Sequence, residues 1–154
     1  MKARTILLTV MVCMAAAAMC FASDPNMGTW KLNEAKSKVA AGLPKSVTVV
    51  YEAAGDKVKV TVDGTGADGQ PVHSEWTGTF DDKDYPVTGD PANDARSYKK
   101  VNDRTLMFTN KKDGKVTMTG RVTVSADGKT RTVETRGMSS DGKMLRGSSV
   151  YDKQ

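Results

Sequence analysis

Hydrophobic and polar residues alternate along most of the chain after residue 22, with the period of two that is typical of half-buried β-strands. The clearest case is residues 57–63, where Val58, Val60 and Val62 alternate with lysine and threonine. Glycine, aspartate and proline separate the alternating segments, as turn residues do. The pattern predicts ten strands, at residues 27–32, 46–53, 57–63, 72–80, 85–87, 96–101, 104–110, 116–124, 130–136 and 144–151.

The last third of the chain repeats the tripeptide Asp-Gly-Lys every 14 residues, beginning at Asp113, Asp127 and Asp141. Asp-Gly between alternating segments predicts a hairpin with a type I′ turn, in which both central residues have positive φ. Turns of about four residues leave strands of about ten residues in each repeat. This region therefore predicts a meander of long antiparallel strands.

One short helix is predicted after the first strand, because Asn33 is a favourable N-cap for a helical turn over residues 34–38. The other connections are too short for crossover helices, so the sheet should be antiparallel. A flat sheet of ten strands would leave long exposed edges, and closure removes them. The predicted fold class is all-β, an up-and-down antiparallel β-barrel of about eight to ten strands. A two-sheet sandwich is the alternative.

Residues 1–22 have the pattern of a secretory signal peptide. A basic start is followed by an uncharged, largely apolar run at residues 6–19, which is short for a membrane-spanning helix. Cleavage after Ala22 would leave residues 23–154 as one barrel domain without a membrane span, exported to the periplasm or the extracellular space. Lipidation of Cys20 and an uncleaved membrane anchor are the alternatives.

The composition of residues 23–154 favours strands over helices. They include 15 valines and 15 threonines but four leucines, and β-branched residues suit a pleated sheet. They contain no cysteine, so the fold needs no disulfide. Their 21 basic and 18 acidic residues are scattered, which argues against a nucleic-acid binder. Two interpretations exist for Arg121, Arg131 and Arg136, a basic stripe on adjacent strands or an ordinary solvated face, and the solvated face is favoured.

Candidate catalytic and metal-binding residues are sparse. His73 is the one histidine in the sequence, and alternation places it with Glu75 on the outer face. A Ser-His-Asp triad would need an inward histidine, and a zinc site would need more ligands. Asp81, Asp82 and Asp84 lack the glycine and the distal glutamate of a calcium loop. We therefore expect no catalytic site, metal site or cofactor, and an enzyme that uses His73 is the least favoured hypothesis.

The first and the last predicted strands both resemble strands of a known protein family. The first strand contains Gly28-Thr29-Trp30-Lys31-Leu32, and the last ends in Val150-Tyr151-Asp152-Lys153. Gly-x-Trp on a first strand resembles the opening motif of the calycins, which comprise the lipocalins and fatty-acid-binding proteins, and both segments are similar to the fatty-acid-binding branch. The whole sequence also resembles small exported lipocalin-like proteins of bacteria. The resemblance implies a barrel with a small-molecule site inside.

Alternation also predicts which side chains line the interior. Trp30 is expected to be a structural plug at one end, with Lys153 or Arg146 over its ring. We expect a monomer that holds a small apolar or amphipathic ligand. The alternative is a filled interior in a non-catalytic envelope interaction module, an inhibitor or accessory protein. The residues predicted to line a ligand cavity are Tyr51, Trp76, Phe80, Met118, Ser149 and Tyr151.

Overall fold

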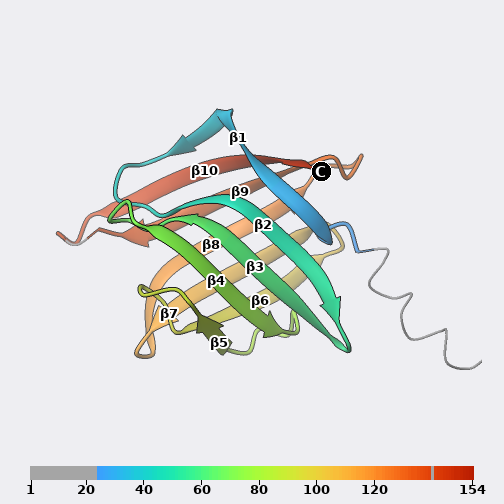
Figure 1. Ribbon diagram of the computed structural model, residues 1–154, viewed down its shortest axis with the longest axis horizontal. Coiled ribbons are helices and arrows are strands. Elements are labelled where there is room, and N and C mark those ends of the chain that lie inside the picture. Colours follow the sequence, from blue (N-terminus) through green and yellow to red (C-terminus); the bar gives the residue numbers. More distant parts are fainter. Residues whose placement is uncertain (1–23, 140) are drawn as a thin grey trace, which may run out of the picture.

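The computed structural model describes residues 24–139 and 141–154, and the expected signal peptide at residues 1–22 lies outside them. The described chain folds into ten strands, each of which corresponds to a predicted one (Figure 1). Among the described residues, no helix has the length and apolar character needed to cross a membrane. The strands are β1 (Gly28–Val39), β2 (Lys45–Ala54), β3 (Lys57–Thr65), β4 (Pro71–Gly78), β5 (Tyr85–Thr88), β6 (Ala95–Asn102), β7 (Thr105–Lys112), β8 (Lys115–Val124), β9 (Thr130–Met138) and β10 (Met144–Lys153).

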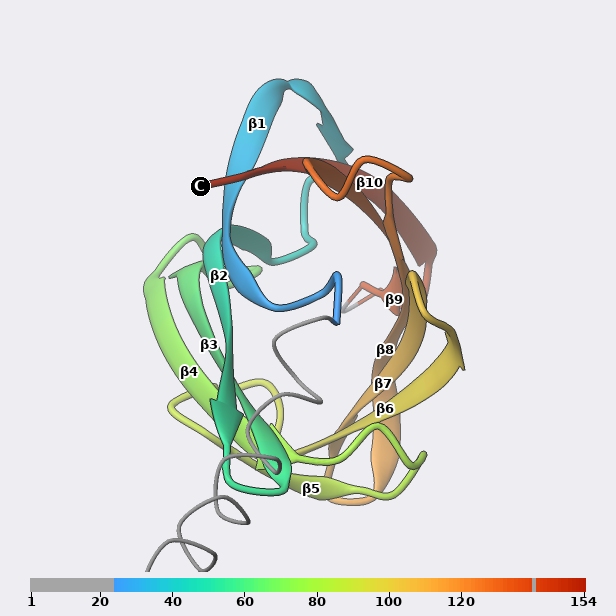
Figure 2. The ribbon, with the colours of Figure 1, turned by 90° about the vertical axis from the view of Figure 1, so that its right-hand side faces the viewer.

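The ten strands form one closed antiparallel barrel, in which each strand pairs with its neighbours in sequence and β1 pairs with β10. Trp30 pairs with Lys153 and Leu32 with Tyr151, so the first strand joins the last directly. Figure 2 shows the strands arranged in order around a common axis. The predicted up-and-down barrel is therefore confirmed, and the sandwich alternative is wrong.

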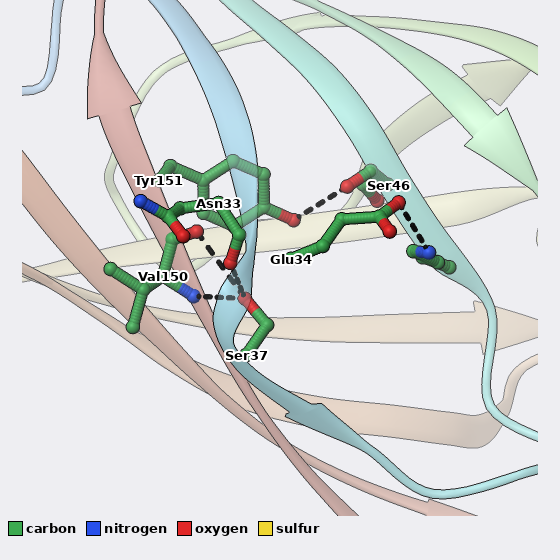
Figure 3. A network of polar contacts seen from close by, with 7 residues as sticks. Asn33, Glu34, Ser37, Ser46, Val150 and Tyr151 are labelled. Atoms are coloured by element: carbon green, nitrogen blue, oxygen red, sulfur yellow. Dashed lines mark hydrogen bonds and ion pairs between the residues drawn. The ribbon is translucent and has the colours of Figure 1, made fainter.

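The helix predicted over residues 34–38 is not formed, because these residues continue β1 through a bulge. The register between β1 and β10 shifts between Asn33 and Lys38. Asn33 Oδ1 accepts a hydrogen bond from the backbone N–H three residues later at 3.2 Å, and Asn33 O accepts one from Ser37 Oγ at 2.7 Å. Ser37 Oγ also accepts from Val150 N at 2.9 Å (Figure 3). Asn33 thus starts a turn, as its N-cap preference indicates, but the turn is a bulge tied to β10.

The Asp-Gly turns of the C-terminal meander are of two kinds. Asp113 and Gly114 have φ of 50° and 73°, which agrees with the predicted type I′ turn. In the next two turns the glycines, Gly128 and Gly142, have positive φ, and in the first of them Asp127 does not. There the glycine N–H donates to the carbonyl of a serine three residues earlier, at 3.0 and 2.9 Å. The type I′ prediction is therefore wrong for the turn at Asp127 and Gly128, although the hairpins form as expected.

One end of the barrel is filled with side chains, and we call it the closed end. It comprises residues 24–27 and the turns that join β2 to β3 and β8 to β9. Trp30 and Trp76 are the largest fully buried side chains of the core, and Leu106 is also fully buried. These residues lie at the ends of β1, β4 and β7 that meet there. The opposite, open end comprises the loops at residues 40–44, 66–70 and 89–94.

Candidate ligand-binding cavity

A cavity of about 470 Å³ reaches into the barrel from the open end. Its rim consists of residues 42–44, 66–68 and 90–93, which belong to the three loops of that end. Its inner wall includes Tyr51 and Tyr151, which are each 3% exposed. The volume falls in the range of about 300 to 1,000 Å³ that is usual for small-molecule sites.

The structure brings together four of the six residues predicted to line a cavity, which are Tyr51, Met118, Ser149 and Tyr151. Trp76 and Phe80 are not part of the lining. Their rings stack at the closed end, with centroids 6.4 Å apart and an interplanar angle of 9°. Trp76 Nε1 also donates a hydrogen bond to the carbonyl of Arg96 at 2.8 Å, which fixes the indole in this position.

Trp30 lies at the closed end, where a plug was expected. Its ring is fully buried, and its Nε1 donates to Asn26 O at 2.8 Å. Lys153 Nζ lies 5.1 Å from the ring centroid, so Lys153 is one cation over this ring. The N-terminal segment before β1 thus holds the indole in place at the closed end through this hydrogen bond.

A second cation lies against Trp30 from the inside, and it belongs to Arg131. This residue was predicted on the solvent face, but it is 2% exposed and lines the cavity. Its Cζ lies 5.1 Å from the ring centroids of Trp30 and Tyr51, and 4.8 Å from that of Tyr151. Within the described chain, its Nε and Nη1 have no hydrogen-bond partner. The prediction of a solvated face is therefore wrong for Arg131, because the guanidinium lies in an aromatic cage inside the barrel.

The tyrosines around Arg131 are neutral hydrogen-bonding groups. Burial raises the pKa of Tyr51, against the opposing pull of Arg131, and burial likewise raises the pKa of Tyr151. Tyr51 Oη donates to Tyr98 Oη at 3.3 Å. Tyr151 Oη donates to Ser46 O at 2.9 Å, which ties β10 to β2 (Figure 3). These phenols do not neutralise the guanidinium, because they stay protonated at neutral pH.

A second arginine, Arg96, also faces the cavity from β6 and is 8% exposed. Its Nε donates to Asn110 Oδ1 at 2.6 Å, so part of its hydrogen-bonding capacity is used within the wall. The acidic residues of the lining, Asp68 and Asp90, both lie on rim loops. Among the described residues, the deeper wall of the cavity therefore carries two guanidinium groups and no carboxylate.

Sequence reasoning missed both inward arginines, although a signal was present. Arg131 lies two residues from Val133, and Arg96 lies two residues from Tyr98. Side chains two residues apart in a strand share a face. The opposite face of β9 carries Glu134, which is exposed. Alternation anchored on these apolar residues would have placed both arginines inside, but the charge of Arg131 favoured a solvent-exposed assignment and Arg96 was assigned to neither face.

His73 lies on the outer face, as its alternation with inward residues indicates. Its Nδ1 is 2.6 Å from Asp63 Oδ1, and Glu75 Oε1 is 2.7 Å from Lys59 Nζ. The hydrogen bond from Lys59 lowers the pKa of Glu75. His73 is not part of the cavity lining. Over residues 24–139 and 141–154, no three histidine, cysteine or acidic side chains come together as a metal site.

Comparisons with known proteins add little to this description. No protein-family model and no curated protein matches the sequence. Among solved structures, the chain is similar to a redesigned β-barrel, mFAP1, whose structure was determined bound to DFHBI. The two share 16% sequence identity and a TM-score of 0.43, over 84% of this chain and 95% of the other. The closed barrel is shown by the strand pairing itself, in which β1 joins β10.

Proposed function

We propose that this protein is an exported carrier that binds a small apolar or amphipathic molecule inside its barrel. The observation that carries the proposal is the cavity of about 470 Å³, which opens at one end and has buried side chains such as Val49, Tyr51 and Tyr151 in its inner wall. The lining combines apolar side chains with a few polar groups, as small-molecule sites do. The cavity disfavours the alternative of an interaction module whose interior is filled.

Two sequence features support the finer parts of this proposal. Gly28-Thr29-Trp30 on β1, with the cation of Lys153 over the indole, favours a calycin-like relationship. The basic and then apolar pattern of residues 1–22 favours export. We propose binding without catalysis, because His73 lies on the outer face and, among the described residues, the cavity lining pairs no nucleophile with a base.

Native mass spectrometry of protein purified without denaturation tests the proposal, since a carrier should retain or accept a small molecule. Ser149→Phe would place a ring in the cavity, whereas Ser148→Phe places the same ring on the outer face of β10. We expect the wild type and Ser148→Phe to bind an apolar fluorescent probe and Ser149→Phe to lose at least tenfold in affinity. Equal binding by the two variants, with both folded, would contradict an internal site.

A further inference from the structure

We propose that the outer face of β8, β9 and β10 is a docking surface for an acidic segment of a partner protein. These three strands lie side by side in the barrel wall (Figure 1). A groove of about 510 Å³ lies on them, and part of its lining comes from the far end of β1. The inference goes beyond the proposed function, since it concerns the outside of the barrel. The cations that line the groove are exposed, and they belong to Lys38, Arg121, Arg136 and Arg146.

The groove is a depression in the sheet surface between long side chains. Thr119, a short residue of the lining, lies directly opposite Arg136 across β8 and β9. Ser148, another short residue, lies opposite Lys38 across β1 and β10. A short side chain next to a long one leaves a hollow with a raised border. Such a hollow accepts a protruding segment of another molecule, whereas a lipid bilayer presents a flat surface.

The groove carries an excess of positive charge. Its four cations accompany one carboxylate of the lining, Glu134, which leaves a net charge of +3. Residues 23–154 contain 21 basic and 18 acidic residues, also a net of +3, so the rest of that chain is balanced. Within the described chain, none of the four cations forms an ion pair. Because charge complementarity selects partners, the partner of this groove should be anionic.

Two of the arginines oppose each other directly. Arg136 on β9 and Arg146 on β10 are cross-strand partners. Opposite residues of an antiparallel pair have Cα atoms about 4.5–5.5 Å apart, and like charges there are destabilising. A carboxylate bound between the two guanidinium groups would relieve this repulsion. The planar fork of arginine also matches a carboxylate with two parallel hydrogen bonds, which lysine does not offer.

The other residues of the groove favour a protein over a nucleic acid as the partner. Met107 belongs to the same lining and is 43% exposed, and methionine and arginine are both enriched at protein–protein interfaces. Nucleic-acid binders commonly contact about 6–10 phosphates, whereas this groove has four cations with Glu134 among them. The occupant that fits is a short acidic segment, with carboxylates for the arginines and an apolar side chain for Met107.

Fluorescein-labelled hexaglutamate and hexaglutamine test this inference, since the two peptides differ in charge and share a backbone. Fluorescence anisotropy of the purified protein at about 50 mM salt measures their binding with moderate screening. We expect the wild type to bind hexaglutamate about tenfold more tightly than hexaglutamine, as several exposed ion pairs together allow. A triple variant, Arg121→Gln, Arg136→Gln and Arg146→Gln, should reduce this ratio to about twofold or less.

A second triple variant gives the same change in net charge at exposed positions outside the groove. It combines Lys57→Gln, Lys83→Gln and Arg104→Gln, and it should keep the full preference for hexaglutamate. Glu134→Gln removes the one carboxylate of the groove lining, so it should strengthen hexaglutamate binding by about 2- to 5-fold. Circular dichroism checks that each variant is folded. If the arginine variant does not fold, the wild-type ratio and Glu134→Gln still decide the question.

Three results would overturn the docking surface. The first is equal affinity of the wild type for the two peptides. The second is an equal loss of preference in both triple variants, which would assign binding to net charge alone. The third is tighter binding of a ten-nucleotide single strand, or of phosphatidylglycerol vesicles, than of hexaglutamate, which would assign the surface to phosphate groups. None of these results bears on the internal carrier, because every substitution lies at an exposed position outside the cavity.

Discussion

Lys153 Nζ lies 5.1 Å from the centroid of the Trp30 ring, and the two residues are direct partners across β1 and β10. On the inner side the same ring meets the guanidinium of Arg131, also at 5.1 Å. Trp30 therefore separates an outer cation, at the end of the chain, from an inner cation at the bottom of the cavity. The contact that joins the first strand to the last also forms the base of the candidate site.

Replacement of Trp30 by alanine should destabilise the barrel strongly. The indole is fully buried, and its removal leaves a cavity and an unpaired carbonyl at Asn26. We expect Trp30→Ala to lower the free energy of unfolding by about 3–5 kcal/mol, as for large aromatic residues in cores. Urea denaturation followed by circular dichroism measures this change. Lys31→Ala, at the next and exposed position of β1, is the control, and equal small effects of the two changes would contradict the role of Trp30.

Replacement of Gly120 on β8 by any residue with a side chain should destabilise the barrel, because neighbouring atoms already occupy the space. A Cβ at this position would lie 2.3 Å from Phe108 Cε1 and 2.8 Å from Glu134 O. We expect Gly120→Ala to cost about 1–3 kcal/mol, as overpacking does. Phe108→Leu should relieve part of that cost, so a double-mutant cycle should show coupling between the two positions. Additive effects within error would show that the ring and the glycine do not share the space.

The order of the strands and their closure could be predicted from the sequence. Alternation of Val58, Val60 and Val62 indicates a strand and its inner face, and short turns join successive strands. Closure was predicted because a flat sheet of ten strands would leave long exposed edges. The prediction of a helix after the first strand was wrong because the Asn33 side chain can accept a hydrogen bond from a nearby N–H both in a helical turn and in a bulge. Pairing with β10, a contact far along the chain, decides between the two.

The charged part of the site could not be predicted, because the cost of burying Arg131 is compensated by residues from other strands. Trp30 on β1, Tyr51 on β2 and Tyr151 on β10 each supply one ring of its cage. Those rings become neighbours of β9 only when the sheet closes. Alternation alone predicted the cavity-lining positions of Tyr51, Met118, Ser149 and Tyr151. Trp76 and Phe80 also alternate inward, but their side chains pack in the filled core at the closed end. Alternation gives the face of a residue and says nothing of how the interior is shared between core and cavity.

The stability of the barrel should fall at alkaline pH because of two buried phenols. Burial raises the pKa of Tyr51 and of Tyr151 above the value of about 10 for an exposed tyrosine. The folded state then binds the phenolic protons of both tyrosines more tightly than the unfolded state does. The free energy of unfolding is therefore constant with respect to these groups below about pH 10 and falls as the pH rises above that value. Each such tyrosine contributes a slope of up to about 1.4 kcal/mol per pH unit.

Urea denaturation between about pH 9 and pH 11 measures this slope, with tyrosinate absorbance as the check on ionisation. A Tyr51→Phe and Tyr151→Phe double variant should lose less stability over that range than the wild type. The same decline in both proteins would assign the alkaline loss to groups outside the cavity.

An NMR titration tests whether the closed barrel takes a small molecule into its interior. Isotope-labelled protein is titrated with naphthoate, and the backbone amide shifts are followed residue by residue. We expect saturable shifts at Tyr51, Met118 and Ser149, and little change at Lys59 and Glu75 on the outer face. Shifts confined to the outer face, or no saturable shifts from any amphipathic probe, would contradict binding in the interior.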